Sequence, residues 1–170
     1  PAIVVFPQCP INSFWSSLSF RADSLGKRSF VFNAANEPTI AMKMANGLLH
    51  ELIKKYPVQK KKVYAGGLSM GGMGTFELVY RNAGLFAAAI PICGGGDPAI
   101  AKKVRKTKWW VFHGAKDDVV LPVYSEIMLA ALKAAKASVK FTLYPDANHN
   151  SWDAAFADPE LLSWLFAQRK

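Results

Sequence analysis

The stretch that decides the fold is Gly67-Leu68-Ser69-Met70-Gly71, a G-x-S-x-G pentapeptide. It directly follows the apolar run 63–65 and precedes a stretch that we expect to be helical from just after Ser69 toward Arg81. A serine in a tight strand-to-helix turn needs glycines two residues before and after it, because a Cβ at either position would collide with neighbouring backbone. The pattern therefore predicts that the Ser69 hydroxyl stands clear of the sheet edge.

Short apolar runs alternate with amphipathic stretches along the chain, and this order predicts a mostly parallel sheet with helices on both faces. We expect strands at 2–6, 63–65, 87–92, 109–112 and 140–144. We expect helices at 39–56, 70–81, 123–137 and 159–168, and a short basic helix at 98–106. No repeat, linker or shift of composition divides the sequence, so the fold class is α/β and residues 1–170 are predicted to form one domain.

The composition excludes several classes of protein. Of the 170 residues, 51% are hydrophobic and 19% are charged, values typical of a folded globular chain and not of a disordered one. No uninterrupted apolar run of about 18 residues, the length that predicts a membrane span, is present, so we expect no membrane partner. No signal-peptide pattern opens the chain, and the sequence predicts a soluble protein without assigning its compartment.

The net charge is +9, and two basic runs stand out, at 60–62 and 102–108. Such a charge suits a polyanionic partner. Neither run is interleaved with exposed aromatic residues or lies in a nucleic-acid motif, so we interpret both as solvated faces and expect no nucleic-acid partner. The two cysteines, Cys9 and Cys93, have no spacing typical of zinc, and no dinucleotide or phosphate-binding glycine pattern occurs. We therefore expect no metal and no cofactor, and the redox state of the cysteines stays open.

A serine hydroxyl is a poor nucleophile at neutral pH, so Ser69 needs a base and an acid that orients this base. Of the three histidines, His149 lies in a loop after the last predicted strand, where catalytic residues of open α/β sheets gather. We predict His149 as the base, the alternative being a loop histidine with no chemistry. His50 lies in a predicted helix and should face solvent, and His113 ends a strand and is expected to have a structural role.

The acid should follow the preceding strand, where Asp117 and Asp118 are adjacent. We predict Asp117. The alternative is that one aspartate caps the following helix and neither meets His149. The resulting chain order of Ser69, Asp117 and His149 is the order of the α/β hydrolases and differs from those of chymotrypsin and subtilisin.

Across most of its length the chain resembles the α/β-hydrolase superfamily, and within it the small bacterial carboxylesterase and phospholipase-like group that borders on dienelactone hydrolases and prolyl-oligopeptidase-type catalytic domains. The resemblance rests on AGGLSMGGMGTFEL (65–78), PICGGGD (91–97), FHGAKDDVV (112–120) and YPDANHNSWD (144–153). It implies an ester hydrolase with Ser69 as nucleophile, His149 as base and Asp117, the first aspartate after His-Gly-x-x, as acid. Dienelactone hydrolases proper use a cysteine nucleophile, so Ser69 argues against that branch.

The sequence departs from this group at the oxyanion hole. Members usually have another strand ahead of the first apolar run, ending in a His-Gly-x-Gly type turn that donates one backbone N–H. Here the N–H of Met70 remains as one donor. We favour the interpretation that the chain is an N-terminally truncated form of the fold; the alternative is a minimal fold in which 2–6 takes the central strand's place and the turn 7–10, through Gln8, supplies the second donor. Filling of the gap beside the Ser69 strand by homo-oligomerisation or domain swapping is a hypothesis.

Three aromatic residues lie on loops expected at the edge of the active site: Phe14 and Trp15 after the first predicted strand, and Trp152 three residues past His149. We predict that they line an acyl or alcohol pocket, the alternative for each being a place in the core. No long hydrophobic lid is present, which favours short, soluble esters as small-molecule substrates. The sequence thus predicts a serine esterase acting through an acyl-enzyme, with a peptidase-type domain, or a non-catalytic fragment or binding module without a complete oxyanion hole, as the alternatives.

Overall fold

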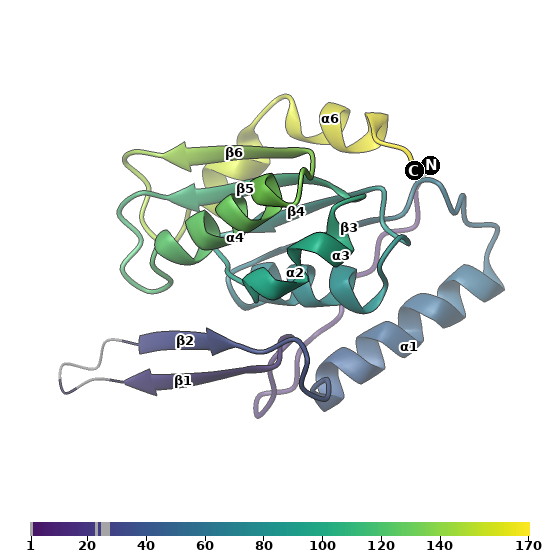
Figure 1. Cartoon of the computed structure of the whole chain (residues 1–170). Coiled ribbons are helices and arrows are strands. Elements are labelled where there is room, and N and C mark those ends of the chain that lie inside the picture. The colour runs from purple at the N-terminus through teal and green to yellow at the C-terminus, as the bar shows by residue number, and fades with distance from the viewer. Residues whose placement is uncertain (1, 23, 25–27) are drawn as a thin grey trace.

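Four strands form a parallel sheet in the order β3-β4-β5-β6, as Figure 1 shows. The computed structural model describes residues 2–22, 24 and 28–170. The strands are β3 (Tyr64–Leu68), β4 (Ala88–Ile92), β5 (Lys108–Gly114) and β6 (Val139–Tyr144). All four were predicted within a few residues, because parallel strands covered by helices read as continuous apolar runs.

The helices are α1 (Ile40–Lys55), α2 (Met70–Arg81), α3 (Ala101–Val104), α4 (Val123–Ala134), α5 (Trp152–Ala157) and α6 (Leu161–Ala167), with the short 3-10 helix η1 (Pro98–Ile100) before α3. The helix expected at 123–137 ends early because Lys136 adopts a left-handed φ of 59° and the Ala137 N–H donates back to the Leu132 carbonyl. The one-and-a-half-turn helix α5 was not predicted. In the described ranges, no helix is both long and apolar enough to cross a membrane.

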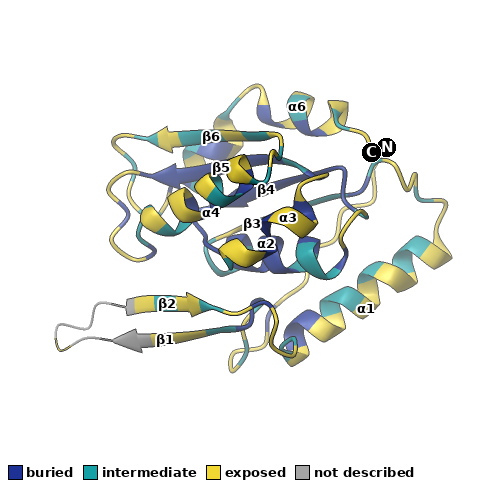
Figure 2. Ribbon diagram, viewed as in Figure 1, coloured by how far each residue is buried: buried dark blue, intermediate teal, exposed yellow. Residues whose placement is uncertain are grey.

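Side chains of the central strands alternate between two cores, and Figure 2 shows these strands buried between their helices. On one face Trp109 of β5 stacks on Phe76 of α2, with ring centroids 5.1 Å apart, and Met128 of α4 completes the layer. On the other face Trp110 packs with Leu165 of α6. Helices therefore cover both faces, as predicted, and fix the carboxyl ends of the strands.

A separate antiparallel hairpin, formed by β1 (Leu18–Ala22) and β2 (Arg28–Phe32), was not predicted. It packs through aromatic rings: Phe30 and Phe32 lie edge-on to Tyr124 of α4, with centroids 5.6 and 5.9 Å away. The backbone N–H of Phe30 also donates to the Tyr124 hydroxyl at 2.8 Å. The hairpin is held by these contacts and not by the main sheet.

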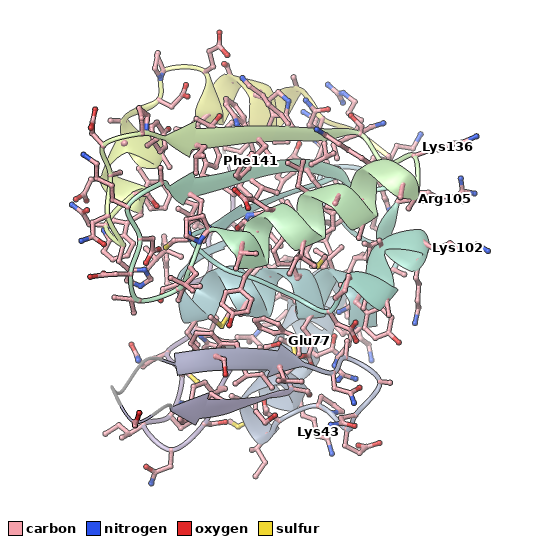
Figure 3. The ribbon with its side chains drawn as sticks, turned by 60° about the vertical axis from the view of Figure 1, so that its left-hand side comes forward. Lys43, Glu77, Lys102, Arg105, Lys136 and Phe141 are labelled. Carbon is pink, nitrogen blue, oxygen red and sulfur yellow. The ribbon has the colours of Figure 1, made fainter. Side chains whose placement is uncertain are left out.

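The chain before the hairpin is tied to α2 by Glu77, labelled in Figure 3, a buried carboxylate that is only 2% exposed. It accepts hydrogen bonds from the Ser16 hydroxyl at 2.8 Å and from the backbone N–H of Ser17. Arg81, one turn along the helix, neutralises it at 2.7 Å. A buried charge needs such partners, so this cluster fixes the loop that follows Trp15.

The expected strand at 2–6 is wrong. These residues run as exposed, irregular chain, with Phe6 90% exposed, and they belong to neither sheet. An apolar run becomes a strand only where a neighbouring strand accepts its hydrogen bonds, and β3 is an edge strand of the described sheet. The alternative in which 2–6 takes the central strand's place is therefore wrong as well.

The second basic run lies on the surface, as predicted. Lys102 and Arg105, together with Lys136, line an open groove of about 620 Å³ between α3 and α4 (Figure 3). None of the three has a carboxylate of the described residues within 4.0 Å. This groove lies at the amino end of β5 and β6, whereas Ser69 follows the carboxyl end of β3.

Candidate active site

Ser69 occupies the turn between β3 and α2 in a conformation that non-glycine residues rarely adopt, with φ 53° and ψ −117°. Its backbone is held by hydrogen bonds, because its N–H donates to the Ile92 carbonyl at 2.9 Å and its carbonyl accepts from Met73 at 3.0 Å. A Cβ at Gly67 would collide with the backbone of Gly71, as the pentapeptide predicted. A Cβ at Gly71 itself would meet nothing within 4 Å, so the predicted clash at that second glycine is wrong.

The structure brings Ser69, His149 and Asp117 together from three loops at the arrowhead ends of the strands in Figure 1. Ser69 Oγ lies 2.9 Å from Nε2 of His149, and Nδ1 of the same ring lies 2.8 Å from Oδ2 of Asp117. The His149 side chain is 19% exposed and the Asp117 side chain is fully buried. Asp118, the alternative acid, is exposed. The spacing and burial suit a nucleophile, a base and an orienting acid.

Asp117 is buried and has no lysine or arginine of the described residues within 4.0 Å, and hydrogen bonds occupy both of its oxygens. Oδ1 accepts from the backbone N–H groups of Val119 and Val120 at 3.0 and 2.9 Å. Oδ2 lies 2.8 Å from His149 and 3.1 Å from Nε2 of His113. These contacts hold the Asp117 carboxylate in one orientation.

His113 was expected to have a structural role, and its contact with Asp117 was missed. It is the penultimate residue of β5 and is completely buried. The signal in the sequence was its place at a strand end, four residues before the predicted acid. His50 is exposed, as predicted, with Nε2 2.8 Å from Oδ1 of Asn82.

The loops that carry the acid and the base touch at Gly114. A Cβ at this position would collide with the backbone carbonyl groups of Ala147 and Asn148, which directly precede His149. The contact is locked by a hydrogen bond from the Lys116 N–H to the Ala147 carbonyl at 3.0 Å. Glycine is therefore required here for the two loops to approach.

The Met70 N–H as an oxyanion donor remains a prediction. The backbone N–H of Met70 belongs to the first turn of α2, where amide groups have no partner within the helix and the helix dipole favours negative charge. Gln8 is exposed, and its side-chain amide donates to the carbonyl of its neighbour Cys9 at 3.2 Å. Gln8 as a second donor remains a prediction.

Of the predicted pocket residues, Trp152 lies beside the base. Its ring is edge-on to that of His149, with centroids 5.3 Å apart. Phe14 packs instead toward Phe20 of the hairpin, with centroids 6.0 Å apart, and Trp15 lies against Gly74 of α2. The described contacts of Phe14 and Trp15 are thus with the hairpin and α2, and their part in a substrate pocket remains a prediction.

A buried thiol lies behind the site. Cys93 follows β4 in a left-handed conformation with φ 41°, and its sulfur, one Asp117 oxygen and one His149 nitrogen lie within 4.8 Å of one another. Such a trio could in principle hold a metal ion. Burial raises the pKa of the Cys93 thiol to about 11, so the thiol is protonated at neutral pH. Both cysteines are free.

The sequence profile described as the dienelactone hydrolase family matches residues 27–160. The chain belongs to this family. The resemblance to the α/β-hydrolase superfamily is thereby confirmed, and the chain matches this family with a serine at position 69.

Two relatives carry the word esterase in their names. The structure of a thermostable esterase superposes with a TM-score of 0.81 at 31% identity, covering 96% of this chain and 43% of that one. The bifunctional acetylxylan esterase/xylanase XynS20E of Neocallimastix patriciarum is 33% identical over 73 residues, which are 43% of this chain and 11% of that protein. The chain therefore spans less than half the length of either relative. SOBER1 of Arabidopsis thaliana shares the fold, with a TM-score of 0.63 and 20% identity over 89% of this chain and 72% of that one.

Proposed function

We propose that this chain carries a serine hydrolase site that cleaves short-chain carboxylic esters through an acyl-enzyme intermediate. One observation carries the proposal: Ser69 Oγ lies 2.9 Å from His149 Nε2, while His149 Nδ1 lies 2.8 Å from Asp117 Oδ2. Both are ordinary hydrogen-bond lengths. Because Asp117 accepts the proton of Nδ1, Nε2 is left as the acceptor for the serine proton.

In the proposed mechanism Ser69 Oγ attacks the ester carbonyl while His149 Nε2 takes the hydroxyl proton. The Met70 N–H stabilises the negative charge that forms on the carbonyl oxygen. The tetrahedral intermediate collapses, and His149 returns the proton to the departing alkoxide, which leaves as an alcohol. A water molecule, deprotonated by His149, then attacks the acyl-enzyme, and the carboxylic acid leaves as Ser69 recovers its proton. Asp117 keeps the imidazole in one tautomer throughout.

The acyl group is proposed to be small. Trp152 lies next to the base and offers a flat apolar wall for a short chain. The name of the Neocallimastix patriciarum relative includes the words acetylxylan esterase, and this supports acetyl esters as the first to test.

The proposal is tested by intact-mass spectrometry after exposure to a fluorophosphonate, with turnover of p-nitrophenyl acetate and butyrate measured on the same sample. We expect one adduct per chain and faster hydrolysis of acetate. Ser69→Ala should lose both labelling and turnover, whereas Ser163→Ala, which changes an exposed serine of α6, should keep both. An anilide with the same acyl group tests the peptidase alternative.

Each outcome decides between the alternatives. Labelling at Ser69 with ester turnover would support a working esterase and a second oxyanion donor within these 170 residues. A folded wild-type chain that is neither labelled nor active would refute the proposal and favour the fragment or binding module. Anilide cleavage as fast as ester cleavage would favour the peptidase.

A further inference from the structure

The carboxylate of Asp117 is shared by two histidines. Its Oδ2 atom lies 2.8 Å from Nδ1 of His149 and 3.1 Å from Nε2 of His113. The proposed mechanism uses the first contact and gives no part to the second. Yet His113 is completely buried, and a buried polar ring this close to the acid acts on it directly.

The proton positions on His113 follow from its neighbours. Nε2 faces Asp117 Oδ2 and, at 2.7 Å, the carbonyl of Val120, and both can only accept, so Nε2 carries a proton. Nδ1 lies 2.7 Å from Oγ of Ser125, whose single hydroxyl proton is shared between this nitrogen and the Gly94 carbonyl, also 2.7 Å away. Burial lowers the pKa of His113, so the ring is neutral at neutral pH. His113 thus acts as a neutral donor whose one Nε2 proton is shared between the Val120 carbonyl at 2.7 Å and Asp117 Oδ2 at 3.1 Å.

We propose that His113 is a positioning residue of the triad, which fixes Asp117 Oδ2 and withdraws part of its negative charge from His149. This inference rests on the proposed function. Without the donor, Oδ2 would attract the protonated ring of His149 more strongly, and the neutral base would form only at higher pH. With it, the carboxylate still orients His149 but holds the imidazolium less tightly.

Few other titratable groups of the described chain face this pair. The loop after β6 contributes His149 itself, and the end of β4 contributes Cys93, whose pKa of about 11 keeps it neutral over the range of the assay. From α4 the facing group is the uncharged Ser125, which also contacts the Gly94 carbonyl at 2.7 Å. A change in the acid limb of the pH profile on altering His113 therefore reports on the contact with Asp117.

The test compares two substitutions at one position. His113→Leu fills much of the space but removes the donor, whereas His113→Gln places an amide nitrogen where Nε2 stands. We expect the acid limb of kcat/KM for p-nitrophenyl acetate to move up by about one pH unit in His113→Leu, the effect of losing one hydrogen bond to a charged group. His113→Gln should restore most of this shift. Ser125→Ala loosens the His113 ring but keeps its Nε2 donor. It should move the acid limb in the same direction as His113→Leu, but by less.

A structural role alone predicts a different result. If His113→Leu and Ser125→Ala lower the melting temperature while the acid limb stays at its wild-type pH, the inference is overturned. Should His113→Leu fail to fold, the pH of the acid limb measured for Ser125→Ala decides whether the inference holds. NMR titration of the His149 ring is the second readout, because its midpoint should move upward in the variants even in a chain that has no turnover. Failure of the proposed function, seen as absent labelling of wild-type Ser69, is thus distinguished from failure of this inference.

Discussion

Replacing Gly114 by alanine should separate the acid and base loops without removing any functional side chain. The glycine ends β5, and a Cβ there would stand 2.8 Å from the carbonyl carbon of Ala147 and closer still to the oxygens of Ala147 and Asn148. Ordinary contacts begin near 3.4 Å. Backbone cannot rotate away as a flexible side chain can, so the loop itself must retreat.

The size of this loop displacement determines the expected loss of activity. Relieving the overlap requires a shift of about 1 Å in the residues directly before His149, and a misplacement of this size typically costs on the order of 100-fold in rate. We expect kcat to fall while KM changes little, because the displaced group is the base and not a residue of the substrate pocket. The bond from the Lys116 N–H to the Ala147 carbonyl, now 3.0 Å, should weaken as well.

The assay is hydrolysis of p-nitrophenyl acetate together with the rate of fluorophosphonate labelling, with circular dichroism to establish folding. Gly47→Ala is the matched control, since a Cβ at this helical position meets nothing within 4 Å. It should keep wild-type turnover and gain about 0.5–1 kcal/mol of stability. A folded Gly114→Ala variant with kcat within about threefold of wild type would refute the reasoning that a 1 Å loop shift misplaces the base.

Three further predictions concern buried groups. Asp117→Asn should lower kcat for p-nitrophenyl acetate by about 10,000-fold while the fold persists, because an amide nitrogen would favour the wrong tautomer of His149; near-normal turnover would count against Asp117 as the acid. Burial raises the pKa of the Cys93 thiol from 9.0 to about 11, so its stabilising effect is complete below pH 9.0 and is lost as the pH rises toward 11. The wild-type melting temperature should therefore fall more steeply between these pH values than that of Cys93→Ser, and parallel curves would contradict this. Glu77→Ala leaves Arg81 without its buried partner and should lower the free energy of unfolding, measured in urea, by about 3 kcal/mol. An unchanged free energy of unfolding would contradict this.

Local pattern was sufficient to predict β3, β4 and α2 beside the site, but not α5, which begins at Trp152. The strands at 64–68 and 88–92 are apolar runs bounded by turn residues, and the helix after Ser69 begins at the glycine-rich turn. The order of Ser69, Asp117 and His149 along the chain then predicted which loops should meet, since the carboxyl ends of parallel strands share one edge. The structure brings these three residues together.

Pairing between distant segments could not be predicted in the same way. The run 2–6 has the composition of a strand but lies outside both sheets, while 18–22 and 28–32 pair with each other. Phe30 and Phe32 of the second of these strands pack on Tyr124, about 90 residues further along the chain. A strand depends on a partner, and local sequence does not identify that partner.

The sequence by itself determined the α/β class, the nucleophile turn and the residues able to act at it, because hydrophobic period and glycine spacing are local properties. Only the tertiary structure decided that Asp117 and not Asp118 faces His149, and that His113 Nε2 lies 3.1 Å from the same carboxylate oxygen. Adjacent aspartates have equal chemistry in an unfolded chain. They differ only when folding buries one of them and surrounds its oxygens with donors from β5, its following loop and the loop after β6.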